Sequence, residues 1–161
     1  MKVLIVGCGR VGGLLAGRLD TEGHEVTIID ENPAQFEKNL PQSFNGATVL
    51  GNGIDLDVLR GAGIQESDAF VILTQGDNRN LMGAQIAKEI FGVPRVLCKV
   101  NDPIRAQTYR SRGIETWSRT TILGELVHEV LLGRSGEPGS VLERARRVDA
   151  TLAGDSAAEE R

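Results

Sequence analysis

Short apolar runs alternate with longer amphipathic segments along the first 133 residues. The apolar runs are rich in Val, Ile and Leu without polar alternation, and they lie at 2–6, 25–30, 46–50, 69–73, 95–100 and 114–117. Segments with helical spacing of their apolar residues follow, at 11–22, 33–40, 55–62, 79–91, 103–112 and 120–132. Strands covered on both faces and joined by helices are typical of βαβ units in a parallel sheet. The pattern predicts a doubly wound α/β fold whose six strands have the order 3-2-1-4-5-6.

The apolar pattern changes after residue 133. Residues 134–140 are rich in Gly, Ser and Pro, which is typical of a linker. Apolar residues recur with weak helical spacing over 141–153, which predicts one short helix, and 154–161 have the composition of a frayed chain end. We therefore expect a domain over 1–133, followed by a linker, short helix and tail over 134–161.

The composition excludes several classes of protein. A formal net charge of −4 over 161 residues argues against a nucleic-acid binder, because such proteins present a basic surface. No apolar run reaches the ~20 residues that cross a bilayer, and the first residues do not read as a signal peptide. Cys8 and Cys98 lie far apart, without the spacing of a metal or redox site. We expect a cytoplasmic protein with no nucleic-acid partner and no metal site.

A glycine-rich segment, Gly-Cys-Gly-Arg-Val-Gly at residues 7–12, joins the first expected strand to the first helix. Gly7 would permit the tight turn, Gly9 would let the backbone approach a pyrophosphate, and Gly12 would let the helix pack closely on the strand. The N–H groups at a helix start also favour phosphate oxygens. This arrangement is typical of a Rossmann-like nucleotide-binding domain, and a tight turn without a ligand is the alternative.

An acidic residue, Asp30, ends the second expected strand, about 20 residues beyond the glycine segment, as the dinucleotide-binding pattern requires. Its carboxylate would accept hydrogen bonds from the ribose hydroxyls of an adenosine and would repel a 2′-phosphate, so NADP is disfavoured. We place the neighbouring Glu31 in the same site. The alternative for Asp30 is an acid in solvent at a strand end.

Other polar residues follow the remaining strands, where ligands of open α/β sheets bind. Asn52 would present its carboxamide to adenine, Thr74 would contact the ribose–phosphate region, and Lys99 would direct a positive charge toward phosphates. Arg10, inside the glycine segment, would reach a terminal phosphate, a partner subunit or solvent. For Asn52 the alternative is a simple turn, and for Lys99 it is a surface position.

Catalytic patterns are missing from the sequence. Neither His24 nor His128 belongs to a nucleophile–base arrangement, Tyr109 is not followed by the Lys of a Tyr-x-x-x-Lys pattern, and no carboxylate pair has an evident acid–base role. The residues after 133 are too few for the substrate domain that a dehydrogenase needs. We therefore predict no catalytic residue, and the protein is expected not to be an enzyme.

Several longer segments resemble the TrkA-N domain family, also called the RCK N-terminal or KTN domain. The resemblance runs from residue 1 to about 133 and rests on VLIVGCGRVGGLLAGRL, HEVTIIDENP, LGNGIDLDVLRGAGIQESDAFVILTQGDNRNL and KVNDP. It implies a regulatory subunit that binds NAD(H) or ATP/ADP, forms homodimers or higher rings, and acts on an integral membrane potassium transporter or channel. Such a subunit lies in the cytoplasm, held at the inner face of the membrane by its partner. The family's binding residues can be carried over to the matching positions of this sequence. The phosphates would then be held by Gly7, Gly9, Arg10, Val11 and Gly12, and the ribose by Asp30. Asn52 would lie near adenine, and Thr74 and Lys99 would line the side of the site that faces the phosphates.

The sequence departs from the family pattern at three places. Gly-Asn-Gly at 51–53 replaces Gly-Asp-Ala, so that an acidic contact becomes neutral. Residues 118–120 read Ser-Arg-Thr where the ATP-binding branch can place a Glu for a divalent ion, so no metal site is expected. The family's C-terminal module is not found here, so either the chain works with a separate partner or the interpretation as a full regulatory subunit is incomplete. Two other functions stay open: a small NAD-dependent oxidoreductase or part of a split enzyme, and a stand-alone nucleotide sensor.

The helix expected at 120–132 carries a broad apolar face. Its apolar residues are Ile122, Leu123, Leu126, Val127, Val130 and Leu131. Such a face is either packed within its own domain or left for a partner. The sequence leaves both open.

Overall fold

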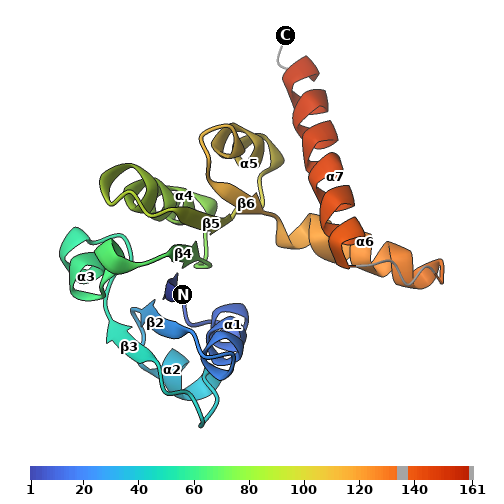
Figure 1. The fold of residues 1–161 in the computed structure, drawn as a ribbon. Helices are drawn as coiled ribbons and strands as arrows, with labels where there is room; N and C mark the ends of the chain where they lie inside the picture. Colours follow the sequence, from blue (N-terminus) through green and yellow to red (C-terminus); the bar gives the residue numbers. More distant parts are fainter. Residues whose placement is uncertain (134–137, 160–161) are drawn as a thin grey trace. The chain divides into compact units, whose positions relative to one another are not determined.

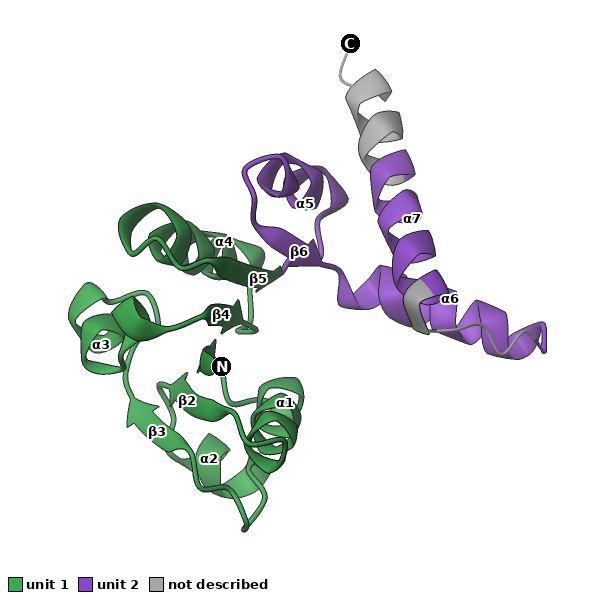
Figure 2. Cartoon of the chain, viewed as in Figure 1, with its two compact units in different colours: residues 1–98 green, residues 99–161 purple. Residues whose placement is uncertain are grey.

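The chain divides into two compact units, 1–98 and 99–161 (Figure 2). The structure is a computed structural model that describes residues 1–133 and 138–159, with side chains over 1–133 and 140–151. The domain boundary expected at 133 stays a prediction. Among the described residues no helix is both long and apolar enough to cross a membrane.

The sheet has the strand order β3-β2-β1-β4-β5-β6, which confirms the predicted order (Figure 1). Its strands are β1 (Lys2–Val6), β2 (Glu25–Asp30), β3 (Ala47–Leu50), β4 (Ala69–Ile72), β5 (Arg95–Lys99) and β6 (Glu115–Trp117). Central β1 pairs in parallel with β2 on one side and β4 on the other, which places Ile5 opposite Ile28 and Val71. The carboxyl ends of β1, β2 and β4 therefore meet at one edge of the sheet.

Helices follow the strands of the first unit as the apolar spacing predicts. They are α1 (Arg10–Thr21), α2 (Ala34–Asn39), α3 (Leu56–Gly61) and α4 (Asp77–Gln85), with a 3₁₀ turn at Ile64–Glu66 and a π turn at Ile86–Ile90. Asp55 begins α3 because its carboxylate accepts hydrogen bonds from the N–H groups of Asp57 and Val58. The helix expected at 79–91 differs slightly from the prediction: α4 starts two residues earlier, at Asp77, and is followed by the π turn.

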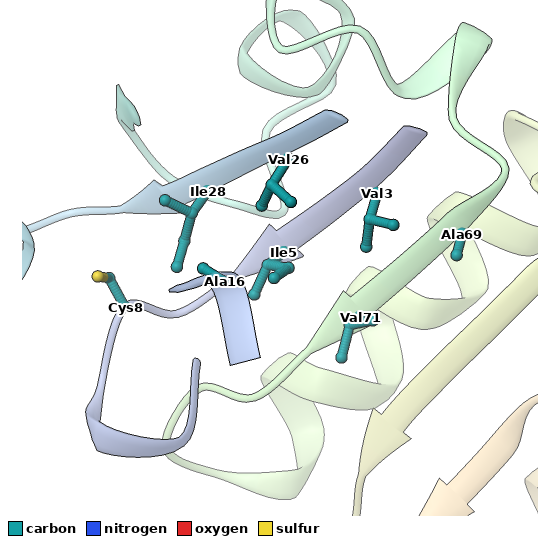
Figure 3. Close-up of a cluster of buried hydrophobic side chains, with 8 residues drawn as sticks. All are labelled: Val3, Ile5, Cys8, Ala16, Val26, Ile28, Ala69 and Val71. Atoms are coloured by element: carbon teal, nitrogen blue, oxygen red, sulfur yellow. The ribbon is translucent and has the colours of Figure 1, made fainter. Parts of the chain in front are cut away.

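One face of the central strands forms an apolar core, drawn in Figure 3. Its fully or nearly buried members are Val3, Ile5, Cys8, Ala16, Val26, Ile28, Ala69 and Val71. Ala16 comes from α1 and Cys8 from the loop before it, so this helix and loop pack directly on β1, β2 and β4. The packing fixes the start of α1 next to the carboxyl end of β1.

The second unit contains α5 (Pro103–Arg110), β6, α6 (Arg119–Leu131) and α7 (Pro138–Glu159). Helix α7 packs on α5 and α6 through the buried side chains of Val141 and Ala145. Asp149, also buried, accepts a 2.6 Å hydrogen bond from Arg110 of α5. This pair joins side chains of α5 and α7, and removal of one partner would leave the other charge without its ionic partner.

The last helix is longer than the sequence predicts. Residues 138–140 of the expected linker and 154–159 of the expected tail belong to α7. Pro138 is tolerated because the first turn of a helix needs no N–H donor from its residues. Residues 134–137 of the expected linker and 160–161 of the expected tail lie outside the described residues.

Candidate functional site

A cleft of about 330 Å³ opens in the first unit where the carboxyl ends of β1, β2 and β4 meet. Ligands of open parallel sheets bind at this position, where the strand connections change direction. The cleft is lined by Val6, Gly7, Gly9, Ile29, Asp30, Glu31, Asn32, Gln35, Gly51, Gly53, Leu73, Thr74, Gln75 and Arg79. The structure therefore brings together five of the predicted site residues: Gly7, Gly9, Asp30, Glu31 and Thr74.

Two of the three motif glycines are required by the fold itself. Gly7 has a φ of 100°, which side-chain-bearing residues rarely adopt, and its N–H donates to the Ile29 carbonyl at 2.8 Å. A Cβ on Gly12 would lie 2.0 Å from the carbonyl oxygen of Gly7. The turn and the close packing of α1 therefore account for both residues without a ligand.

Gly9 differs from these two glycines. Its φ of −76° and ψ of −173° are extended values that any residue adopts. A Cβ built on Gly9 meets no heavy atom of the described chain within 4 Å, and the residue lines the cleft. The fold gives no reason for glycine here, whereas a group held in the cleft does, because a side chain would take up its space.

The start of α1 supplies hydrogen-bond donors next to Gly9. The first bond along the helix runs from Gly13 N–H to the Gly9 carbonyl at 2.8 Å, so the N–H groups of 10–12 precede the ladder. These groups and the positive end of the helix dipole favour an anion. The site therefore suits phosphate groups close to Gly9.

Asp30 is held firmly at the opposite side of the cleft from β4. Its Oδ2 accepts a 2.7 Å hydrogen bond from Cys8 N–H, and its Oδ1 accepts a 2.9 Å bond from Asn32 N–H. Each carboxylate oxygen keeps a further lone pair that can accept from a hydroxyl group. The two backbone bonds thus orient Asp30 for a diol such as a ribose.

The cysteine of the loop is inert. Cys8 is buried, and its Sγ lies 3.6 Å from the Gln35 carbonyl. Burial, and secondarily the Asp30 carboxylate, raises the pKa of the Cys8 thiol to about 11. The thiol therefore stays protonated at neutral pH and is not a nucleophile.

Thr74 follows β4 and is bound by Asn80, which is fully buried at the start of α4. The Thr74 hydroxyl and backbone N–H both lie within hydrogen-bond distance of Asn80 Oδ1, at 2.6 and 3.0 Å. Asn80 Nδ2 donates to the Thr74 carbonyl at 3.0 Å. One buried amide thus fixes the wall of the cleft opposite Asp30.

A surface ion pair joins two sides of the cleft. Arg79 of α4 lies 2.8 Å from Glu31, which follows β2, and both side chains are partly exposed. Arg79 and Gln35, the second of which lines the cleft from α2, are not among the site residues that the sequence predicts. No local pattern marks either residue, since each reaches the site through the packing of its helix.

The remaining predicted residues are not among those that line the cleft. Arg10 lines a separate groove of about 690 Å³ between α1 and residues 38–43, Val11 is exposed, and Gly12 is buried under the loop. Asn52 Oδ1 accepts a hydrogen bond from Ile54 N–H at 3.2 Å, between two glycines that line the cleft. Lys99 belongs to the second unit. Ligand contacts by these residues stay predictions.

The described part of the chain contains no group of three or more His, Cys, Asp or Glu residues arranged to hold a metal ion. The donors and acceptors of the cleft are backbone N–H groups, carboxylates and a hydroxyl. They suit a polar organic ligand with both anionic and hydroxyl groups.

Comparison with known proteins gives a consistent result. The TrkA-N domain profile matches residues 3–119. The Trk system potassium uptake protein TrkA of Streptomyces coelicolor is 42% identical over 138 residues, which cover 86% of this chain and 61% of that protein. The chain thus spans about three fifths of the length of this relative.

Solved structures share the fold. The Kef CTD of Shewanella denitrificans in its AMP-bound form has a TM-score of 0.71 at 21% identity, over 99% of this chain and 97% of that one. The GsuK channel bound to NAD has a TM-score of 0.66 at 20% identity, over 78% of this chain and 22% of that one. At these identities the likeness concerns the fold.

Proposed function

The chain belongs to the TrkA-N domain family, a family of regulatory rather than catalytic domains, and from this premise we propose that it is a nucleotide-binding subunit that controls a potassium transporter or channel. The ligand is an adenine nucleotide held in the cleft of the first unit. Gly9 is the observation that carries this proposal, because the fold explains every other motif glycine but leaves this one to a ligand.

The cleft fits an adenine nucleotide group by group. Phosphates would lie on the N–H groups of 10–12 beside Gly9, and ribose hydroxyls would donate to Asp30. Adenine would lie toward the Gly51–Gly53 turn, near Asn52. A 2′-phosphate would face the Asp30 carboxylate, so NADP is disfavoured, whereas NAD(H), ATP, ADP and AMP all carry the required diol. The AMP and NAD bound to structures of the same fold support this ligand class.

A face of α6 is suited to a partner. Leu123, Leu126, Val127, Val130 and Leu131 are exposed, the last two by 71% and 80%. Nothing in the described part of the chain covers these side chains, which favours the partner over the alternative of internal packing. We place a second copy of the chain on this face, in a homodimer or a larger ring that acts on the transporter at the cytoplasmic side of the membrane.

Regulation requires that the nucleotide binds one arrangement of the assembly more tightly than another, because equal affinity for two arrangements leaves their populations unchanged. The test is uptake of ⁸⁶Rb⁺, a potassium substitute, into proteoliposomes that hold a potassium transporter co-purified with the chain. We expect uptake to change on addition of NAD or ADP when the parent chain is present. Gly9→Val should retain the transporter but lose the nucleotide response, and Val130→Asp should lose the assembly.

Two results would contradict this proposal. Turnover of NADH in an absorbance assay with a substrate panel would indicate an oxidoreductase. Nucleotide binding without any effect on uptake, in a complex that contains both proteins, would indicate a stand-alone sensor.

A further inference from the structure

A second groove lies beside α1, apart from the nucleotide cleft. Its volume is about 690 Å³, and it is lined by α1 on one side and by residues 38–43 on the other. No residue lines both this groove and the cleft. Arg10, Leu14 and Arg18 line it at intervals of four positions, so they lie on one face of α1.

The groove is basic. Arg10, Arg18 and Lys38 line it, all three are exposed, and none of them forms an ion pair with another described residue. Glu22 is the one acidic residue among those that line the groove. Because the whole chain has a formal net charge of −4, this positive charge is a local feature of the surface. It favours an anionic occupant.

Close packing at two glycines of α1 fixes the shape of the groove. A Cβ on Gly13 would lie 2.4 Å from the carbonyl oxygen of Asn39, and a Cβ on Gly17 would lie 2.8 Å from Cγ of Pro41. Asn39 Nδ2 also donates a 2.9 Å hydrogen bond to the carbonyl of Cys8, in the loop before α1. The two sides of the groove are therefore held together before any occupant binds.

The spacing of the charges indicates the shape of the occupant. Eight residues of α-helix separate Arg10 from Arg18, which corresponds to about 12 Å along the helix axis. Leu14 lies halfway between them and is 66% exposed. A small anion would meet only one end of this arrangement, and a flat membrane surface would not enter a groove. The arrangement fits an elongated occupant with two negative charges and an apolar group between them.

An extended acidic peptide meets these requirements. In an extended chain the side chains at i, i+2 and i+4 lie on one side, and four residues span about 13 Å. A sequence of the form Glu-x-Leu-x-Glu would therefore place one carboxylate near each arginine and its leucine on Leu14. Arginine also binds carboxylates through paired hydrogen bonds, which lysine does not offer in the same geometry.

The acidic residues of this chain do not supply such a segment. Among the residues whose side chains are described, Glu125 and Glu129 have the four-residue spacing. They belong to helix α6, in which four residues span only about 6 Å. Arg144 lies 3.5 Å from Glu125 and 3.3 Å from Glu129, so both carboxylates already have a cationic partner. These facts favour a segment of a different protein over a second copy of this chain.

We propose that the groove beside α1 binds an acidic, extended segment of a partner protein, with carboxylates on Arg10 and Arg18 and an apolar side chain on Leu14. Lys38 adds positive charge from the opposite side of the groove. This inference goes beyond the proposed function, and it does not depend on a bound nucleotide.

The test is fluorescence anisotropy of a dye-labelled synthetic peptide that carries Glu-Ser-Leu-Ser-Glu at its centre, titrated with the full chain. Two matched peptides serve as controls: Lys-Ser-Leu-Ser-Lys reverses the charges, and Glu-Ser-Ser-Ser-Glu removes the apolar side chain. We expect the parent to bind the first peptide more tightly than either control. Its affinity should fall as salt is added, because the charges of the groove are exposed.

Charge reversal in the protein tests the same contact from the other side. Arg18→Glu should weaken binding of the acidic peptide by about 3- to 10-fold, since an attraction between exposed charges is replaced by a repulsion. Arg119→Glu is the matched control, because it makes the same change of charge at an exposed position of the second unit. It should bind the peptide as the parent does. Thermal unfolding shows whether each variant is folded.

Several results would overturn the inference. Equal affinity for the three peptides, or an equal loss in Arg18→Glu and Arg119→Glu, would show that the groove does not select the segment. Sedimentation with phosphatidylglycerol vesicles that is lost in Arg18→Glu, without peptide binding, would indicate a membrane surface. Binding of inorganic pyrophosphate but not of the peptide would indicate a small anion. Reduced self-association of Arg18→Glu in analytical ultracentrifugation would indicate a second copy.

The inference and the proposed function can fail separately. Binding of NAD without binding of the acidic peptide would leave the proposed function standing and overturn the inference. Selective binding of the peptide by a chain that binds no nucleotide would do the reverse.

Discussion

Replacement of Gly9 by valine should remove nucleotide binding while it leaves the fold intact. The backbone of Gly9 is extended, a Cβ built on it would meet no heavy atom of the described chain within 4 Å, and the residue lines the cleft. A valine side chain would therefore fit the protein but occupy the place of the phosphates. Few substitutions in a glycine-rich loop separate binding from stability in this way.

The expected change in stability is small because two effects oppose each other. Gly9 occupies the N-cap of α1, where replacement of glycine by an apolar residue costs up to about 1 kcal/mol. Replacement of glycine also lowers the conformational entropy of the unfolded chain, which stabilises the folded state by about 0.4–1 kcal/mol. The net change should lie within about 1 kcal/mol, or about 4 °C in Tm for a chain of this size.

The expected change in binding is large. A phosphate displaced from the helix start loses hydrogen bonds between charged oxygens and backbone N–H groups, each worth about 1.5–3 kcal/mol. Loss of two such bonds weakens binding by a factor on the order of 100 or more. Affinity for NAD should then fall out of the range that calorimetry detects.

Gly12→Ala is the matched comparison for stability, because it should lower Tm where Gly9→Val does not. Its Cβ would lie 2.0 Å from the Gly7 carbonyl oxygen, against 3.4 Å or more in ordinary contact, so backbone must move. Overpacking of this kind costs about 3 kcal/mol, which lowers Tm by about 6–12 °C. Thermal unfolding and calorimetry on the parent and both variants check these values. Parent-like NAD affinity in Gly9→Val would refute the placement of the phosphates, and a large loss of Tm in that variant would refute the structural reasoning.

Further predictions concern the site and the second unit. Asp30→Asn and Asp30→Ala should both weaken NAD binding. Asp30→Asn keeps one acceptor oxygen for the N–H of Cys8 and should lower Tm less than Asp30→Ala, which removes both acceptors; calorimetry and thermal unfolding compare the two. The pKa of the Cys8 thiol is raised from an ordinary 9.0 to about 11, so between these values the folded state keeps a proton that the unfolded state releases. The contribution of Cys8 to the unfolding free energy should therefore be constant below pH 9 and fall from pH 9 to 11, and denaturant titrations should show a smaller fall in Cys8→Ala. Asp149→Ala should lower the unfolding free energy by about 2–3 kcal/mol, because it leaves Arg110 without its buried partner, and urea unfolding should measure the loss. Val130→Asp should reduce self-association in analytical ultracentrifugation, since the exposed valine would be replaced by a charge that the contact with a second copy would bury.

The fold, and the positions of Gly7, Gly9 and Asp30 in the site, can be predicted from local sequence signals. Buried strands show as uninterrupted apolar runs, and the strand order follows from their alternation with helices. Gly7, Gly9 and Asp30 lie at fixed distances from these strands, and the structure places all three at the cleft. These predictions depend on short-range geometry, which periodicity and spacing encode.

The rest depends on side-chain directions that spacing does not encode. Arg10 follows Gly9 directly, yet the rotation of α1 turns it to a separate groove. The Asn80–Thr74 bonds and the Arg79–Glu31 pair join residues through the packing of α4, which the sequence pattern does not specify. The length of α7 was underestimated because a Gly/Ser/Pro composition favours a linker, although its docking on α5 and α6 stabilises the helix.

A crystal structure of the chain with NAD tests the placement of the ligand most directly. We expect the pyrophosphate within hydrogen-bond distance of the N–H groups of 10–12 and the adenosine ribose on Asp30. A ligand bound outside this cleft, for example in the groove beside Arg10, would contradict it.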